Sequence, residues 1–186
     1  MPGLVYLFFF CSGLSGLIYQ IVWVRVFGNL FGNTIHSASV VVAVFMLGLG
    51  VGSWVVGTWS DRWYAATEPK SLVRTYGYFE LVIGLMGISI SLLLPHLSTV
   101  SALVSSYSQD DTGWYVLSTT SYLARVGIAF VLLVPITLLM GGTLTLLVRH
   151  LVRDNPQSDN WKIAVLYGVN TAGAAVGCLL TDFALV

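Results

Sequence analysis

Four polar side chains within long apolar segments of this sequence are candidates for chemistry. Glu80 lies near the start of one such segment, and Tyr19, Gln20 and Asn170 lie within two others. A carboxylate at that depth can attract a cationic substrate or relay a proton, because ionisable groups inside a bilayer are costly and are commonly functional. One interpretation is therefore a substrate pocket built from these four residues.

The other interpretation of these residues is structural. Glu80 falls in the first two turns of its predicted helix, where negative charge is favoured, and it could equally pair with a nearby arginine. Tyr19, Gln20 and Asn170 could hydrogen-bond between helices instead of binding a ligand. The sequence leaves both interpretations open.

Three further charged residues are expected at a common depth. Arg25 ends one apolar segment, Arg125 begins another, and Asp182 lies about 20 residues, or roughly 30 Å of helix, beyond Lys162. The structural hypothesis is that Asp182 neutralises Arg25 or Arg125 and fixes the bundle. The functional hypothesis is an outer gate or a cation site.

Familiar catalytic and metal-binding patterns do not occur in the sequence. It has no Gly-rich phosphate loop, nucleophile elbow, HExxH motif or Cys/His cluster. Cys11 and Cys178 lie in apolar runs and read as small buried residues, and His36, His96 and His150 lie in three separate segments. We therefore expect no catalytic residue, no metal site and no cofactor.

Composition places the chain in a membrane. Apolar residues make up 56% of the sequence, charged residues only 9%, and eight basic side chains balance eight acidic ones. The mean hydropathy is +0.86, whereas soluble domains carry about a quarter charged residues. Neutral net charge gives no indication of a nucleic-acid partner.

Five apolar runs are long enough to cross a bilayer as helices, which takes about 20 residues each. They are continuously apolar rather than alternating, which excludes strands. We predict a single all-α membrane domain over residues 1–186, a polytopic bundle that stops short of a longer protein. The predicted spans are Leu4–Phe27, Ile35–Trp59, Tyr76–Leu97, Tyr122–Val148 and Ile163–Val186.

The charges of the loops predict how the chain is oriented across the membrane. Ser60–Thr75 and Arg149–Lys162 each hold three basic residues, whereas Ser98–Ser121 holds none. By the positive-inside rule the two basic loops are cytoplasmic and the N-terminus is inside. With no cleavage site after the first apolar run, that run is expected to be a retained span. The predicted location is the bacterial cytoplasmic membrane.

Two local features refine the bundle. Loosely helical spacing over Leu97–Tyr107, followed by the interfacial residues Trp114 and Tyr115, predicts a short interfacial helix on the outer face. An outer-face ligand lid is the alternative. Pro135 with the Gly141–Gly142–Thr143 sequence predicts a kinked or broken fourth span, and broken helices line sites in transporters.

Small residues at four-residue spacing predict close helix packing. Met46–Arg62 carries such a stripe and ends in the charged pair Asp61–Arg62, and the fifth span carries a second stripe. Small-xxx-small spacing lets a second backbone approach closely in a bilayer. The partner of the first stripe is expected among spans one, four and five or on a neighbouring subunit. The packing residues are Gly48, Gly52, Ser53, Gly57, Gly173 and Gly177.

Several stretches together resemble the major-facilitator-like membrane half of the bacterial fused spermidine synthase-like membrane proteins. The resemblance runs in order over nearly the whole chain. The stretches are Ser12–Thr34, Phe45–Arg62, Tyr78–Leu85, Pro135–Arg149 and Leu166–Leu180. The positions that match the polar pattern of the family are Tyr19, Gln20, Trp23, Arg25, Asp61, Arg62, Glu80 and Asn170.

The resemblance implies a membrane module without the catalytic domain. In that family the helices precede a Rossmann-like aminopropyltransferase domain, and its Gly- and Asp-rich nucleotide motif is not present in this sequence. The enzyme activity is therefore not carried over. The chain departs from the family at Thr145, where a second proline is common, and this weakens the broken-helix argument.

Three functional hypotheses follow. The first is a non-catalytic anchor or transport-like module for a polyamine-type cation, with the lipid bilayer and a C-terminal domain as partners. The second is an accessory or scaffolding subunit docked by its glycine faces to other subunits of a larger membrane complex. The third, a complete aminopropyltransferase, requires residues beyond Val186.

Overall fold

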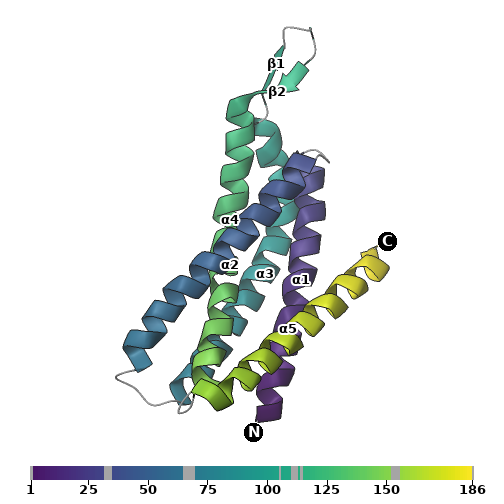
Figure 1. The fold of residues 1–186 in the computed structure, drawn as a ribbon. Coiled ribbons are helices and arrows are strands. Elements are labelled where there is room, and N and C mark those ends of the chain that lie inside the picture. The colour runs from purple at the N-terminus through teal and green to yellow at the C-terminus, as the bar shows by residue number, and fades with distance from the viewer. Residues whose placement is uncertain are drawn as a thin grey trace.

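The computed structural model describes residues 2–31, 35–64, 70–104, 106–109, 113, 115–151 and 156–185. Over these residues the chain forms a five-helix bundle with one small β-hairpin (Figure 1). The helices are α1 (Pro2–Phe31), α2 (Ile35–Tyr64), α3 (Lys70–Val104), α4 (Thr119–Leu151) and α5 (Pro156–Leu185). The strands are β1 (Tyr107–Gln109) and β2 (Tyr115–Leu117), which pair antiparallel.

All five helices are long and apolar enough to cross a membrane. They contain 30 to 35 residues, so each reaches past the roughly 30 Å hydrocarbon layer. Helices satisfy their own backbone groups where no water is present, which is why continuous apolar runs take this form in lipid. The all-α membrane bundle predicted from the sequence is confirmed.

The connection between α3 and α4 differs from the prediction. Residues 97–104 are helical, but they continue α3 without interruption, and Tyr107 belongs to β1. A separate interfacial helix at Leu97–Tyr107 is therefore wrong. Extending an existing helix needs no new nucleation, whereas a short isolated helix does. Gly113, with a φ of 84°, lies between the two paired strands.

α4 runs unbroken through Pro135, so the broken-helix alternative for the fourth span is wrong. Proline removes one backbone donor, and one missing hydrogen bond is tolerated in a helix of 33 residues. Two residues later the Thr137 hydroxyl donates to the carbonyl oxygens of Leu133 and Val134, which adds local polar contacts.

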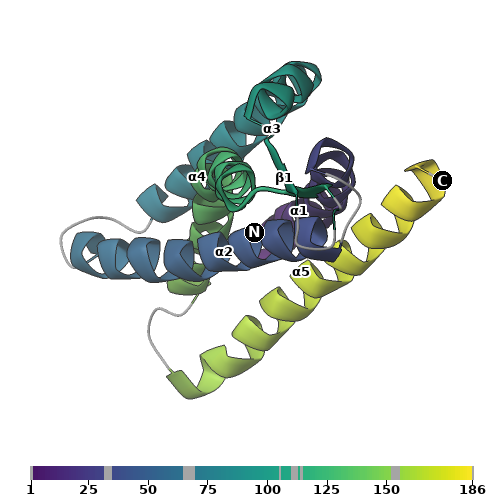
Figure 2. The same ribbon diagram turned by 90° about the horizontal axis from the view of Figure 1, so that it is seen from above.

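Two pairs of helices make the most extensive contacts, α2 with α4 and α1 with α5, and α3 packs mainly on α4. Figures 1 and 2 show α5 crossing α1 obliquely, with its C-terminal end away from the other helices. One buried cluster lies around Trp23, Phe27, Phe45 and Leu133. A second cluster, around Phe9 and Leu146, lies nearer the other end of the bundle.

The close contact of α2 with α4 depends on glycine. A Cβ atom on Gly52 would overlap the Leu138 carbonyl, and one on Gly48 would overlap the Thr137 side chain. Ser53 Oγ donates a hydrogen bond of 2.9 Å to the Gly141 carbonyl oxygen across the same interface. Of the candidate partners for the Met46–Arg62 stripe, the structure therefore places α4 against it. A Cβ atom on Gly57 would meet the Thr145 side chain only at ordinary van der Waals range.

The close contact of α1 with α5 also depends on glycine. A Cβ atom on Gly173 would overlap the Phe10 carbonyl, and one on Gly177 would overlap the Leu14 carbonyl. On the opposite helix, Gly13 lies directly against Asn170, whose backbone and side-chain oxygens a Cβ atom would meet. This close approach sets Asn170 beside α1.

Candidate functional site

Glu80 faces α1 from the first third of α3. Its Oε1 accepts a hydrogen bond of 2.7 Å from Ser12 Oγ, and both side chains are partly buried. Ser15, one turn after Ser12, donates its hydroxyl to the Ser12 carbonyl oxygen. The partner of this carboxyl is therefore a serine on another helix, rather than the arginine or helix N-terminus considered from the sequence.

Tyr76 completes the surroundings of Glu80. It lies one turn before Glu80 on α3, and its side chain is buried, with 4% exposed. Its hydroxyl lies beside the carboxyl and Ser12, but it makes no hydrogen bond of normal geometry to any described residue. A buried hydroxyl of this kind has capacity to donate to or accept from a ligand.

Glu80 lies inside the hydrocarbon span. The apolar stretch of α3 runs from Leu72 to Leu93, so eight residues, or about 12 Å of helix, separate Glu80 from its start. An ionised carboxylate at such depth is costly unless a counter-charge or strong donors accompany it. The single bond from Ser12 stabilises the carboxylate but does not neutralise it.

A cavity of about 530 Å³ opens between α1 and α3 at this point. We call it the Glu80 cavity. One carboxylate, two serine hydroxyls and two aromatic rings face it, among otherwise apolar walls. The lining residues are Phe8, Cys11, Ser12, Ser15, Tyr76, Gly77, Glu80 and Leu81.

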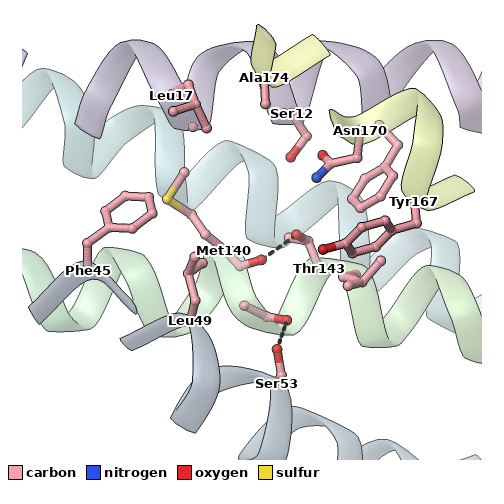
Figure 3. A pocket seen from close by; sticks show the side chains of 15 residues that line it. Ser12, Leu17, Phe45, Leu49, Ser53, Met140, Thr143, Tyr167, Asn170 and Ala174 are labelled. Carbon is pink, nitrogen blue, oxygen red and sulfur yellow. Dashed lines mark hydrogen bonds between the residues drawn. The ribbon is translucent and has the colours of Figure 1, made fainter. Parts of the chain in front are cut away.

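A second cavity, of about 240 Å³, lies between α1, α2, α4 and α5. We call it the Asn170 cavity. Figure 3 shows Asn170 and Tyr167 entering from α5, with Ser12 nearby on α1 and Thr143 opposite on α4. Ser12 also lines the Glu80 cavity, so the two cavities lie on adjoining faces of α1 and share this small side chain.

The structure brings together two of the four candidate binding residues and separates the others. Glu80 and Asn170 lie at neighbouring positions of α1, against Ser12 and Gly13 respectively. Tyr19 instead stacks on Trp23, with ring centroids 5.4 Å apart, and packs against Gly87 of α3. Neither Tyr19 nor Gln20 is among the residues that line the two cavities.

The charged residues at the helix ends form interhelical contacts. Arg25 and Asp182 form an exposed ion pair at 3.4 Å. Arg125 donates to the Phe31 carbonyl oxygen and lies over the Phe31 ring, 5.7 Å from its centroid.

At the opposite end of the bundle, Asp61 pairs with Arg149 of α4, and Arg62 is exposed. The partner of Asp61 is thus on another helix rather than its neighbour in sequence. Among the described residues, no group of three His, Cys, Asp or Glu side chains could hold a metal ion.

Sequence reasoning missed Ser12 and Tyr76 as parts of this site. Ser12 and Ser15 are three residues apart within an apolar run, a spacing that puts both on one helical face. Tyr76 and Glu80 are four apart and share a face in the same way. These two spacings are the features of the sequence that could have identified Ser12 and Tyr76 as parts of the site.

Comparison with known proteins gives one informative likeness. No family model and no solved structure matches the chain. Polyamine aminopropyltransferase 2 of Streptomyces coelicolor is 26% identical over 178 residues. The match covers 95% of this chain but only 28% of that relative, so the chain spans little more than a quarter of the relative's length.

Proposed function

We propose that this chain is a membrane module that holds a polyamine-type cation at Glu80, as an anchor or transport-like unit. No bond is made or broken by its residues in this proposal. The observation that carries it is the Glu80 carboxylate, held by Ser12 and facing a cavity inside the membrane span.

The chemistry of the Glu80 cavity supports an alkylammonium ion. A protonated primary amine donates three hydrogen bonds, and the cavity offers oxygen acceptors from Glu80 and Ser15. Tyr76 and Phe8 add aromatic rings, whose faces attract a desolvated cation by about 2 kcal/mol. Apolar walls suit the methylene chain that joins the nitrogens of a polyamine.

The distant relative supports the same class of ligand. That relative is a polyamine aminopropyltransferase by name. The part of it that this chain matches is short relative to the whole. We propose that the two proteins share a membrane module and that this module serves polyamine chemistry without performing it.

Equilibrium binding tests the proposal. Purified protein in neutral lipid nanodiscs is titrated with spermidine and putrescine, and Glu80→Gln is compared with the wild type. We expect saturable binding that weakens at least about tenfold, or 1.4 kcal/mol, in Glu80→Gln. Asp182→Asn is the matched control, because it removes a carboxylate that lines neither cavity. Absence of saturable binding, or equal affinity in Glu80→Gln, contradicts the proposal.

A scaffolding role in a larger membrane complex is the second candidate. It is favoured by α5, which packs mainly on α1 and leaves large apolar side chains exposed, Trp161, Leu179 and Phe183 among them. Purification from native membranes in mild detergent distinguishes the scaffolding role from the cation-binding role. Stoichiometric co-purifying subunits favour the scaffold, and migration as a single species removes it.

A further inference from the structure

The two cavities are separate, but they share one lining residue of α1. Ser12 lines both, and its hydroxyl donates to Glu80 on one side. On the other side Gly13 is packed against Asn170. The carboxyl of Glu80 and the amide of Asn170 therefore flank α1 at neighbouring positions.

The Asn170 cavity differs in chemistry from the Glu80 cavity. It has no carboxylate or basic group among its lining residues, but it contains amide, hydroxyl and phenol groups from Asn170, Ser53, Thr143 and Tyr167. Figure 3 shows the Asn170 side chain directed into this space. Its amide can accept and donate hydrogen bonds at once.

We infer that the two cavities form one bipartite site for an aliphatic amine with two nitrogen atoms. One ammonium group lies at Glu80, the methylene chain passes Ser12, and the second nitrogen is bound by the oxygen atoms of the Asn170 cavity. This inference rests on the proposed function and specifies its ligand as a diamine or longer polyamine rather than a monoamine.

Charge and size support the assignment of one nitrogen atom to each cavity. A single carboxylate neutralises a single ammonium group, so the second nitrogen requires other acceptors. Cations inside membranes also pair with carbonyl oxygens, and the Asn170 side-chain oxygen is one such acceptor. The Asn170 cavity, at about 240 Å³, is the smaller of the two, which suits the end of a chain rather than a whole ligand.

A ligand series tests the inference. The affinities of 1-aminobutane and 1,4-diaminobutane, which have the same carbon chain, are measured on the wild type and on Asn170→Leu in nanodiscs. We expect the diamine to bind about tenfold more tightly than the monoamine to the wild type. Asn170→Leu should abolish this preference and leave monoamine affinity unchanged, which also shows that the variant is folded.

Two further variants complete the design. Thr171→Val removes a hydroxyl from the next position of α5, which bonds within its own helix, and it should retain the preference for the diamine. Tyr167→Phe should reduce the preference even if Asn170→Leu does not fold. Equal binding of the two amines to the wild type, or equal weakening of both by Asn170→Leu and by Tyr167→Phe, overturns the inference. Loss of all amine binding to the wild type overturns the proposed function as well.

Discussion

Ser12 Oγ on α1 donates a hydrogen bond of 2.7 Å to Glu80 Oε1 on α3, across 68 residues of sequence. The bond holds the carboxyl, which lines the Glu80 cavity, beside the one residue that lines both cavities. A charge-assisted bond of this kind contributes about 1.5–3 kcal/mol. The position of the only carboxylate that lines either cavity among the described residues therefore depends on one hydroxyl.

Replacing Ser12 by alanine should weaken spermidine binding. The carboxylate loses a donor that stabilises its ionised form and its orientation, at about 1.5 kcal/mol, which corresponds to roughly a tenfold higher Kd. Isothermal titration calorimetry measures the change. Ser89→Ala is the control, because this hydroxyl of α3 donates to the Leu85 carbonyl oxygen of its own helix. If both variants bind like the wild type, the role assigned to Ser12 is wrong.

Replacing Gly52 by alanine should destabilise the bundle. Its new methyl group would overlap the Leu138 backbone, and such overpacking costs about 1–3 kcal/mol. Gly50→Ala, two residues away, meets nothing within 4 Å and should change the free energy of unfolding by less than about 0.5 kcal/mol. Steric-trapping measurements in bicelles give both values. Equal effects of the two substitutions would show that α2 and α4 do not pack as described.

Exchanging the charges of Arg25 and Asp182 should restore the stability that each single charge reversal removes. The pair is exposed, so its coupling should be modest, about 0.2–1 kcal/mol. The free energy of unfolding is compared for Arg25→Asp, Asp182→Arg and the double variant. A double variant that is as unstable as the sum of the two single variants would contradict the pairing.

The basic loops predict that the N-terminus is cytoplasmic. In a variant with Cys11 and Cys178 replaced by serine, Gln109→Cys in the β-hairpin should react with an impermeant maleimide in intact cells. Arg62→Cys, at the end of α2 that is predicted to be cytoplasmic, should react only after the cells are permeabilised. Both residues are exposed, so side-chain burial cannot account for a difference in their labelling. The reverse labelling pattern would invert the orientation.

The number and position of the helices could be predicted from the sequence because length and continuous apolarity suffice. The predicted span Leu4–Phe27 lies within α1, and Ile35–Trp59 lies within α2. The hairpin over Tyr107–Leu117 could not be predicted in this way. Its strands are three residues each, too short for an alternating pattern to be distinct.

The site was predicted only in part for a different reason. Glu80 and Asn170 are conspicuous as polar residues in apolar runs, so composition identifies them. Their neighbours depend on which helix faces lie together, and helices that are apolar all round carry little information about that. Tyr19 shows the limit: its polarity suggested a pocket, whereas its ring stacks on Trp23.

Cys11 offers the most direct test of the central claim, because its thiol lines the Glu80 cavity. Cys178, on α5, lines neither cavity, and both cysteines are exposed, so the prediction that they are buried is wrong. The two alkylation rates with N-ethylmaleimide are measured in one sample by mass spectrometry, with and without spermidine. The account predicts that spermidine slows modification of Cys11 and not of Cys178, and that Glu80→Gln abolishes the protection. Equal rates at Cys11 with and without spermidine at saturating concentration would contradict it.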